Sequence, residues 1–297
     1  MIWLINYADE TYKNAQKYNS YTAKRIGKVD KVLEYTPESI DKEFIEKNKQ
    51  WFVVGDSQIG KYGLWRPIIL QDAYSKINEG DYLIYADAGT FFVNDVHHLT
   101  ELMDDRGLNI LVFSLPFVEK QWTKRDILIR LNADTERITD SNQRMSTCFV
   151  IKKSSEGEEL INRYKEVAEL YPELFTDEGN RLGKDNYPNF IQNRHNQSVL
   201  SVLTKSMEIP AFRDPTEYGS KEKLYSFYDI PQSAIVPSVY EKSPYPQILV
   251  QHRRGKVTYF VRLYALIRSK FPYAVSATLI KIATLRQRII RLGKEKL

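Results

Sequence analysis

The sequence predicts an α/β sandwich, in which strands alternate with helices along the chain. Short apolar runs that are typical of buried strands recur from the first residues onward, and segments with helical spacing of apolar residues separate them. The length of 297 residues suits one large domain or two small ones.

The apolar pattern defines the expected elements in order. Strands are expected over Ile2–Asn6, Lys31–Tyr35, Tyr82–Ala86, Ile110–Leu115, Cys148–Ile151 and Ile248–Val250. Helices are expected over Tyr12–Gly27, Pro67–Ile77, Glu156–Leu170 and Val199–Met207. The run Tyr82–Ala86 indicates a central strand buried on both faces. Ligands of such sheets bind outside the carboxyl ends of the strands, so the residues that follow the strands are the first candidates for a site.

The segment WFVVGDSQIGKYGLWRPIIL, residues 51–70, nearly matches the phosphate loop GxxxxGK[ST]. Tyr62 stands where a Ser or Thr would hold Mg²⁺, and a phenol cannot take that place. A helix should also follow at once, whereas Pro67 predicts a helix that starts several residues later. The segment is therefore not expected to belong to an ATPase.

The cysteine content and the first residues of the sequence indicate in which cellular compartment the protein is expected. Cys148 is the single cysteine, which excludes an internal disulfide framework and a CxxC metal site. The first residues show no basic region followed by an apolar run, so no signal peptide is expected. A reducing cytoplasm is the expected location.

The positive charge is concentrated near the end of the sequence. Residues 252–297 contain twelve Lys or Arg and one acid, Glu295, whereas the remainder carries a net charge of −6. Leu279, Ile282, Leu285 and Ile289 recur at helical spacing there. The pattern predicts a domain over 1–251 and a basic amphipathic helical tail over 252–297. Its expected partner is the anionic inner face of the cell membrane, with the protein bound peripherally; nucleic acid is not expected.

Asp87 is the strongest candidate for a ligand-binding side chain. It follows the predicted central strand directly, and Gly89 lets a ligand approach the backbone closely. Such a carboxylate suits a divalent metal on a diphosphate or a sugar hydroxyl; the alternative is a strand end followed by a capped turn. Tyr7 and Asp9 follow the first strand and are expected to hold a nucleoside.

Three motifs in order resemble those of bacterial GT-A-fold glycosyltransferases. The first comprises Gly63, Trp65, Arg66 and Pro67, the second comprises Tyr85, Asp87, Ala88 and Gly89, and the third is RHNQSVLSVL over 194–203. The sequence is similar to capsular-polysaccharide and lipopolysaccharide galactosyltransferase-like proteins, which are distantly similar to glycosyltransferase family eight. The resemblance covers roughly residues 1 to 250 and implies a GT-A-like, Rossmann-type nucleotide-sugar-binding sandwich.

The resemblance also implies roles for single residues. Gln197 and Asn196 would orient the transferred sugar as catalytic residues together with Asp87, and His252 would join Asp87 on Mn²⁺ or Mg²⁺. Gly89 and Asn196 each stand where the related patterns have Asp. The implied donor-binding residues are Tyr7, Asp9, Lys61, Arg66, Tyr85, Asp87, Ala88 and Gly89.

One further polar and aromatic cluster follows the strand at 110–115. It consists of Glu119, Lys120, Trp122, Lys124 and Asp126. A solvated loop is the expected structure of this segment, and part of an acceptor site is the alternative.

The predicted function is the transfer of a hexose from a nucleotide-diphosphate sugar, with a UDP-sugar favoured, to a glycan or lipid-linked acceptor in surface polysaccharide synthesis. The resemblance hints at retention of the anomeric configuration. Two alternatives remain at this point. One is a nucleotidyltransferase, and the other is a non-catalytic, membrane-associated glycan-binding module.

Overall fold

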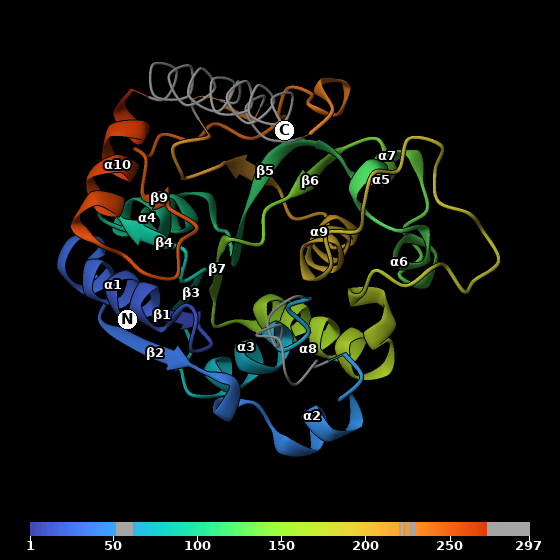
Figure 1. Cartoon of the computed structure of the whole chain (residues 1–297), viewed down its shortest axis with the longest axis horizontal. Coiled ribbons are helices and arrows are strands. Elements are labelled where there is room, and N and C mark those ends of the chain that lie inside the picture. The colour runs from blue at the N-terminus through green and yellow to red at the C-terminus, as the bar shows by residue number, and fades with distance from the viewer. Residues whose placement is uncertain (52–61, 220, 222–223, 226–229, 272–297) are drawn as a thin grey trace, which may run out of the picture.

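The computed structural model describes residues 1–51, 62–219, 221, 224–225 and 230–271. Its centre is a mixed sheet of seven strands with helices on both faces (Figure 1). The predicted α/β class is confirmed. Lys61 and the predicted stripe from Leu279 onward lie outside the described residues, so those predictions are not tested.

The sheet is built mainly from parallel strands. The order is β2-β1-β3-β7-β5-β6, and β8 also pairs with β5. β2 and β3 run parallel to β1, β8 runs parallel to β5, and β7 is antiparallel to both β3 and β5. The strands are β1 (Ile2–Tyr7), β2 (Lys31–Tyr35), β3 (Tyr82–Ala86), β5 (Ile110–Val118), β6 (Asn142–Arg144), β7 (Cys148–Lys152) and β8 (Ala211–Arg213).

Ten α-helices surround the sheet in the described part of the chain. They are α1 (Lys13–Thr22), α2 (Lys42–Lys47), α3 (Arg66–Ser75), α4 (His97–Arg106), α5 (Glu119–Trp122), α6 (Arg125–Arg130), α7 (Glu136–Thr139), α8 (Ser155–Leu170), α9 (Asn196–Ser206) and α10 (Tyr259–Lys270). A π-helical turn, Ala23–Gly27, extends α1.

Alternation along the strands produces two apolar cores, one on each face of the sheet. Trp3 and Ile5 of β1 pack in the core that α3, α8 and α9 cover. Ile2 and Leu4 point to the other face, where α4 packs. Successive side chains of a strand point to opposite faces, so an uninterrupted apolar run can fill both cores at once.

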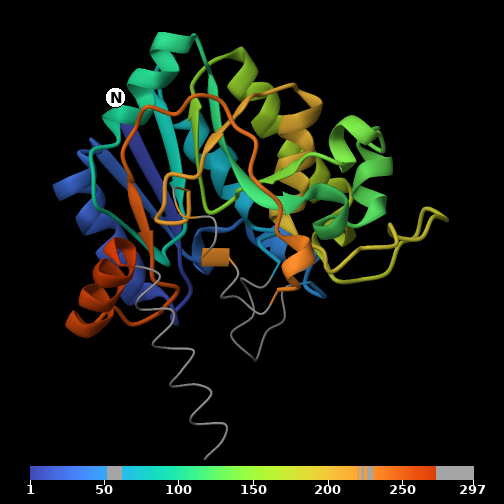
Figure 2. The ribbon, with the colours of Figure 1, turned by 90° about the horizontal axis from the view of Figure 1, so that it is seen from above.

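Residues 249–271 pack against the rest of the protein. Strand β9 (Leu249–Gln251) pairs with β4 (Thr90–Phe92) in a small antiparallel sheet. Arg268 of α10 forms an ion pair with the buried Glu217. Figure 2 shows α10 next to α1 at one end of the molecule. No helix within the described ranges is long and apolar enough to cross a membrane.

The structure contains elements that the sequence pattern did not indicate. β4, β6 and β8 have three residues each, too few for an alternating pattern to be recognised. Helix α4 starts at His97, and its buried face includes Leu99 and Met103.

Candidate active site

A cleft of about 570 Å³ opens at the carboxyl ends of β1 and β3. This is the edge of a parallel sheet at which α/β proteins bind ligands. Residues that follow β1 and β3 contribute to its walls, as do the residue before β7, the start of α3, the start of α9 and the end of β9. The described lining residues are Tyr7, Ala8, Asp9, Tyr12, Trp65, Arg66, Tyr85, Asp87, Ala88, Gly89, Thr90, Thr147, Arg194, Gln197, Gln251 and Arg253.

Arg66 connects the three sequence motifs at the wall of this cleft. Its Nη2 donates to Oδ1 of Asp87 at 2.8 Å, and its Nη1 donates to Oδ1 of Asn196 at 2.6 Å. Nη1 also donates to the carbonyl of Ser146 at 2.8 Å. The Arg66 side chain is 6% exposed, and its guanidinium lies 4.3 Å from the centre of the Tyr85 ring. These contacts hold a buried cation rigidly in place.

The Asp87 carboxylate has one oxygen engaged and one that a ligand can reach. The Tyr85 hydroxyl donates to Oδ1 at 2.6 Å, the same oxygen that accepts from Arg66. The Asp87 side chain is 36% exposed, so Oδ2 is available to a ligand in the cleft. Burial disfavours the Arg66 charge, but Tyr85 and Asp87 outweigh burial and raise the pKa of Arg66 above its usual value.

Gly63 explains how Asn196 reaches Arg66. Gly63 has a φ of +63°, a left-handed conformation that side chains disfavour. A Cβ at this position would lie 2.1 Å from Nδ2 of Asn196. The Asn196 Nδ2 donates to the carbonyl of Tyr62 at 3.2 Å. A glycine is therefore required for the loop before α3 to pack against the start of α9.

Gln197 lies at the junction of the cleft with a second pocket. Its Nε2 donates to Oε1 of Gln143 at 2.7 Å, and its Oε1 accepts from the amide of Ser146 at 3.4 Å. Gln143 is buried and donates in turn to the carbonyl of Trp122 at 3.1 Å and to Glu119 at 3.2 Å. This chain of hydrogen bonds sets the orientation of the Gln197 amide.

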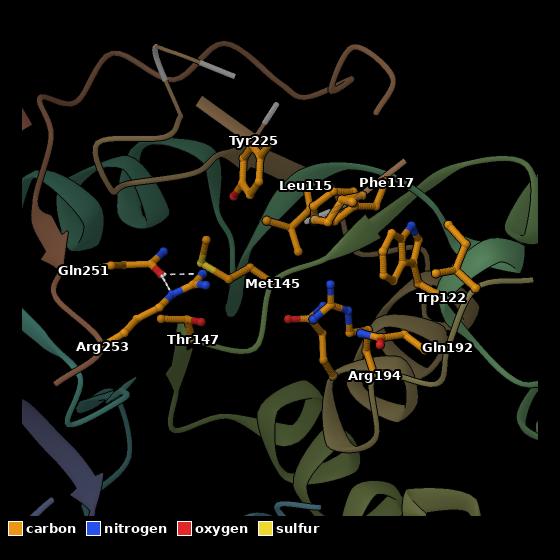
Figure 3. A pocket seen from close by; sticks show the side chains of 13 residues that line it. Leu115, Phe117, Trp122, Met145, Thr147, Gln192, Arg194, Tyr225, Gln251 and Arg253 are labelled. Carbon is orange, nitrogen blue, oxygen red and sulfur yellow. Dashed lines mark hydrogen bonds between the residues drawn. The ribbon is translucent and has the colours of Figure 1, made fainter. Parts of the chain in front are cut away.

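The second pocket, of about 340 Å³, extends the cleft over an aromatic wall. Thr147, Arg194, Gln197, Gln251 and Arg253 line both spaces, so the two form one continuous site with two arms. We call them the polar arm, at Asp87, and the aromatic arm. The remaining described residues of the aromatic arm are Leu115, Phe117, Trp122, Met145, Ile191, Gln192, Tyr225 and Ile230 (Figure 3).

Two arginines stand where the arms meet. Figure 3 shows Arg194 and Arg253 reaching the pocket from opposite sides. The Arg194 guanidinium lies 4.4 Å from the centre of the Trp122 ring. Arg253 donates through Nε and Nη2 to Oε1 of Gln251, at 3.2 and 3.1 Å. Burial and then the nearby charge of Arg253 lower the pKa of Arg194 to about 10, which leaves it charged at neutral pH.

The structure brings most of the predicted site residues together. Tyr7, Asp9, Arg66, Tyr85, Asp87, Ala88, Gly89 and Gln197 all line the polar arm. Asn196 does not line either arm among the described residues; its side chain is bound to Arg66 and Tyr62. Asn196 therefore positions Arg66, whereas its predicted contact with the transferred sugar has no support from its placement.

The residues expected to hold a nucleoside are partly occupied by contacts within the protein. The Tyr7 ring stacks on Trp65, with 3.7 Å between ring centres, so one of its faces is covered. Oδ1 of Asp9 accepts from the amide of Tyr12 at 3.1 Å. Both side chains still line the polar arm, beside Tyr12 and Trp65.

His252 is not placed as the predicted metal site requires. It lies outside the lining of both arms, and its ring stacks on Phe91 with 6.0 Å between ring centres. Its Nδ1 accepts from the amide of Arg254 at 3.1 Å. Within the described ranges, no three His, Cys, Asp or Glu side chains come together to hold a metal. The predicted pairing of Asp87 with His252 on Mn²⁺ or Mg²⁺ therefore does not fit the residues at the site.

The end of strand β9 explains this correction. Gln251, its last residue, pairs with Thr90, and both line the polar arm. The chain turns after the strand: Arg253 has a φ of +52° and lines the polar arm as well, whereas His252 lines neither arm. Sequence reasoning singled out the histidine and passed over Arg253. The strand pattern does not extend to Arg253, so it could not have identified this residue.

The polar cluster after β5 is buried rather than solvated. Glu119 accepts from the hydroxyls of Thr123 and Ser201 and pairs with Lys205 at 2.6 Å. Trp122 is also buried and lines the aromatic arm. The expectation of a solvated loop was wrong, because partners from other segments satisfy these polar groups inside the protein: Ser201 and Lys205 at Glu119, and backbone groups at Lys124 and Asp126.

The fold and the site define an α/β protein with a cleft at the carboxyl ends of parallel strands, the place at which such proteins bind ligands. No protein-family model and no curated protein matches the sequence. Solved structures with a similar fold include glycosyltransferases, the class that the sequence motifs resemble.

Three of these structures span most of the described chain. The galactosyltransferase LgtC, in complex with donor and acceptor sugar analogs, has a TM-score of 0.49 and 11% identity over 93% of this chain and 95% of its own. Mouse xyloside xylosyltransferase 1 has a TM-score of 0.45 and 9% identity over 87% of this chain and 100% of its own. The glycosyltransferase GlyE of Streptococcus pneumoniae TIGR4 has a TM-score of 0.40 and 13% identity over 95% of this chain and 63% of its own.

Proposed function

We propose that this protein is a glycosyltransferase that moves a hexose from a nucleoside-diphosphate sugar to a hydroxyl of a second ligand. The observation that carries the proposal is the continuity of the two arms at Gln197. A transferase must hold two ligands so that their reacting atoms meet, and a site with two arms and a shared wall does this. The polar arm, with its arginines and Asp87, suits the charged donor.

The aromatic arm suits a sugar acceptor. Phe117 and Trp122 present apolar ring surface there, while Gln192 and Arg194 supply polar groups. Mostly apolar walls with a few placed polar groups are typical of sites for small ligands. We propose a glycan or lipid-linked acceptor of surface polysaccharide synthesis, and UDP as the carrier of the donor sugar, in line with the resemblance of the sequence motifs.

We further propose that the transfer retains the anomeric configuration. The bond between the anomeric carbon and the phosphate oxygen breaks, and its electron pair leaves with that oxygen. The acceptor oxygen forms the new bond on the same face, and its proton passes to the departing phosphate oxygen. Asp9 and Asp87, the carboxylates of the described lining, both belong to the polar arm, so the acceptor is not placed against a separate base.

We also propose that residues 252–297 attach the protein to the anionic inner face of the cell membrane from the cytoplasm. The described start of this segment supports the proposal. Tyr259 and Phe260 of α10 are 67% and 78% exposed, and Arg262, Arg268 and Lys270 lie on the same helix. Exposed aromatic rings with basic neighbours suit a membrane interface. A membrane-bound enzyme would meet a lipid-linked acceptor directly.

The test of the transferase proposal is binding and turnover of the donor. UDP, GDP, CDP and ADP are added separately while thermal unfolding is followed, and release of the diphosphate from the matching hexose conjugate is then measured. One diphosphate should raise the unfolding temperature, because it binds the folded state alone. Asp87→Asn keeps the acceptor for Arg66 and Tyr85 but should weaken donor use; Asp105→Ala, at an exposed acid, is the control. No response to any of the four would overturn the donor site.

A further inference from the structure

The carboxylate that would anchor a metal is already paired with a buried cation. Oδ1 of Asp87 accepts from Arg66 and Tyr85, and the Arg66 side chain is almost wholly buried. A divalent ion on the remaining oxygen would lie beside this guanidinium, where the low local dielectric strengthens repulsion between like charges. The pair instead leaves Oδ2 as a hydrogen-bond acceptor for a hydroxyl of the donor.

The neighbouring positions do not supply further metal ligands. Gly89 stands two residues after Asp87, and the ring of His252 packs against Phe91 instead of lining the cleft. A Mg²⁺ or Mn²⁺ site needs several oxygen or nitrogen ligands at close range. The described lining of the polar arm offers two carboxylates, Asp9 and Asp87. Oδ1 of each already accepts a hydrogen bond within the protein, from the Tyr12 amide at Asp9 and from Arg66 and Tyr85 at Asp87.

Positive charge is available at the place where a diphosphate would lie. Among the described residues shared by the two arms, Arg194 and Arg253 carry the charge, and the others are Thr147, Gln197 and Gln251. The two side chains repel each other, because the charge of Arg253 contributes to the lowered pKa of Arg194. An anion bound between them would interact favourably with both guanidinium groups.

Both arginines are positioned by the backbone around them. The amide of Arg194 donates to the carbonyl of Trp122 at 3.1 Å and to the Ser198 hydroxyl at 3.0 Å. The amide of Arg253 donates to the carbonyl of Gly89 at 3.1 Å. Arg253 is thereby tied to the loop that follows Asp87. Planar guanidinium forks match phosphate oxygens in pairs.

We infer that Arg194 and Arg253 bind the diphosphate of the donor in the place of a divalent metal, and that the site works without one. The inference rests on the proposed transferase function and specifies how the charge of the leaving diphosphate is stabilised. Fixed cations placed where negative charge develops stabilise a transition state without rearrangement. A metal-free diphosphate clamp therefore joins the two arms.

The test is calorimetric titration of the full-length protein with UDP, and with inorganic pyrophosphate as a probe without a base. Each titration is run in excess EDTA and again in MnCl₂. The affinity should be the same in both conditions within about threefold. Arg194→Gln and Arg253→Gln should each weaken binding about tenfold or more, as expected for the loss of a charge-assisted pair. Arg194→Lys keeps the charge but loses the planar pair of donors, so its affinity should lie between those of the unaltered protein and Arg194→Gln.

Arg137→Gln is the matched control, because Arg137 is exposed and pairs with Glu208 on the surface. Its affinity should equal that of the unaltered protein. Binding that appears only in MnCl₂, or that survives both arginine changes, would overturn the inference and leave the donor site standing. If neither probe binds in either condition, the proposed transferase function itself fails, and the inference fails with it.

Discussion

Nη1 of Arg66 donates to Oδ1 of Asn196 across 130 positions of sequence, at a distance of 2.6 Å. The same guanidinium bonds to Asp87, so residues from three separated motifs share one buried cation. The arrangement explains why the first motif contains an arginine, Arg66, and why the third motif contains an amide side chain, Asn196. Its contribution to stability and to donor binding can be measured separately.

Replacing Arg66 by Met should lower the free energy of unfolding by about 3 kcal/mol, since a buried charge pair loses one partner. The Ser146 carbonyl and Asn196 would lose a donor as well. Arg66→Lys keeps the charge and should cost about 1 to 2 kcal/mol. Urea unfolding of both variants checks this. Unchanged stability of Arg66→Met would contradict the central position of the pair.

Gly63→Ala should destabilise the protein by about 2 to 3 kcal/mol. The left-handed backbone accounts for about 1 kcal/mol of this loss, and the rest comes from the clash of the new methyl group with Asn196. Gly80→Ala is the control, because Gly80 also has a positive φ but a Cβ there meets nothing within 4 Å. It should lose only the backbone part. Equal losses in thermal or urea unfolding would show that the packing against Asn196 is unimportant.

Gln197→Ala should lower kcat for transfer about 100-fold with little change in the donor KM. The amide lies at the junction of the arms, and a placed polar group that acts on developing charge affects the transition state most. Gln143→Ala should give a smaller loss, because Gln143 only orients that amide. Gln71→Ala, outside both arms, is the control. A rise in KM alone would assign Gln197 to donor binding.

His252→Asn should flatten the dependence of stability on pH between pH 4 and pH 6.5. Burial, and next the charge of Arg268, lower the pKa of His252 to about 4 from the ordinary 6.5. In this window the unfolded chain binds a proton that the folded chain does not bind, so stability is complete above pH 6.5 and is lost as the pH falls toward 4. Asparagine does not titrate in this range, and its side-chain oxygen can still accept a hydrogen bond from the Arg254 amide.

Urea unfolding at several pH values in that window checks the slope. His98→Asn, at an exposed histidine of α4, serves as the comparison. If the slope is the same in His252→Asn as in the unaltered protein, His252 titrates normally and is not held in a buried setting.

Phe260→Ser should weaken binding to vesicles that contain anionic lipid by about tenfold, because a large aromatic side chain no longer inserts. Co-sedimentation measures the bound fraction, and added salt should weaken binding of the unaltered protein. Val239→Ser is the control, since Val239 is 77% exposed but lies outside α10. Equal binding to neutral vesicles would argue against the anionic membrane as the partner.

Much of the central sheet could be predicted from local pattern alone. The range Lys31–Tyr35 and the range Tyr82–Ala86 were predicted with the observed bounds, and helix α3 starts one residue before Pro67. Tyr82–Ala86 is an uninterrupted apolar run, and the proline at the start of α3 restricts the backbone. The three-residue strands β4, β6 and β8 carry no such pattern and depend on their pairing partners.

The candidate site was predicted in part for the same reason. A carboxylate directly after a buried strand must lie at the carboxyl edge of the sheet, and Asp87 does. The local sequence does not show which distant side chain a residue will contact. Asn196 was expected to contact the sugar, but it bonds to Arg66, and this contact depends on how two distant loops pack.

The sequence by itself determined the α/β order of elements, the helix start near Pro67 and the placement of Asp87, because each follows from residues close together in the chain. Only the tertiary structure decided that Arg66 occupies the Asp87 carboxylate, that His252 faces Phe91, and that Arg194 and Arg253 meet between the two arms. These relationships join residues that are far apart in sequence, and the packing of distant segments selects among them. The charge balance of the site is thus a property of packing.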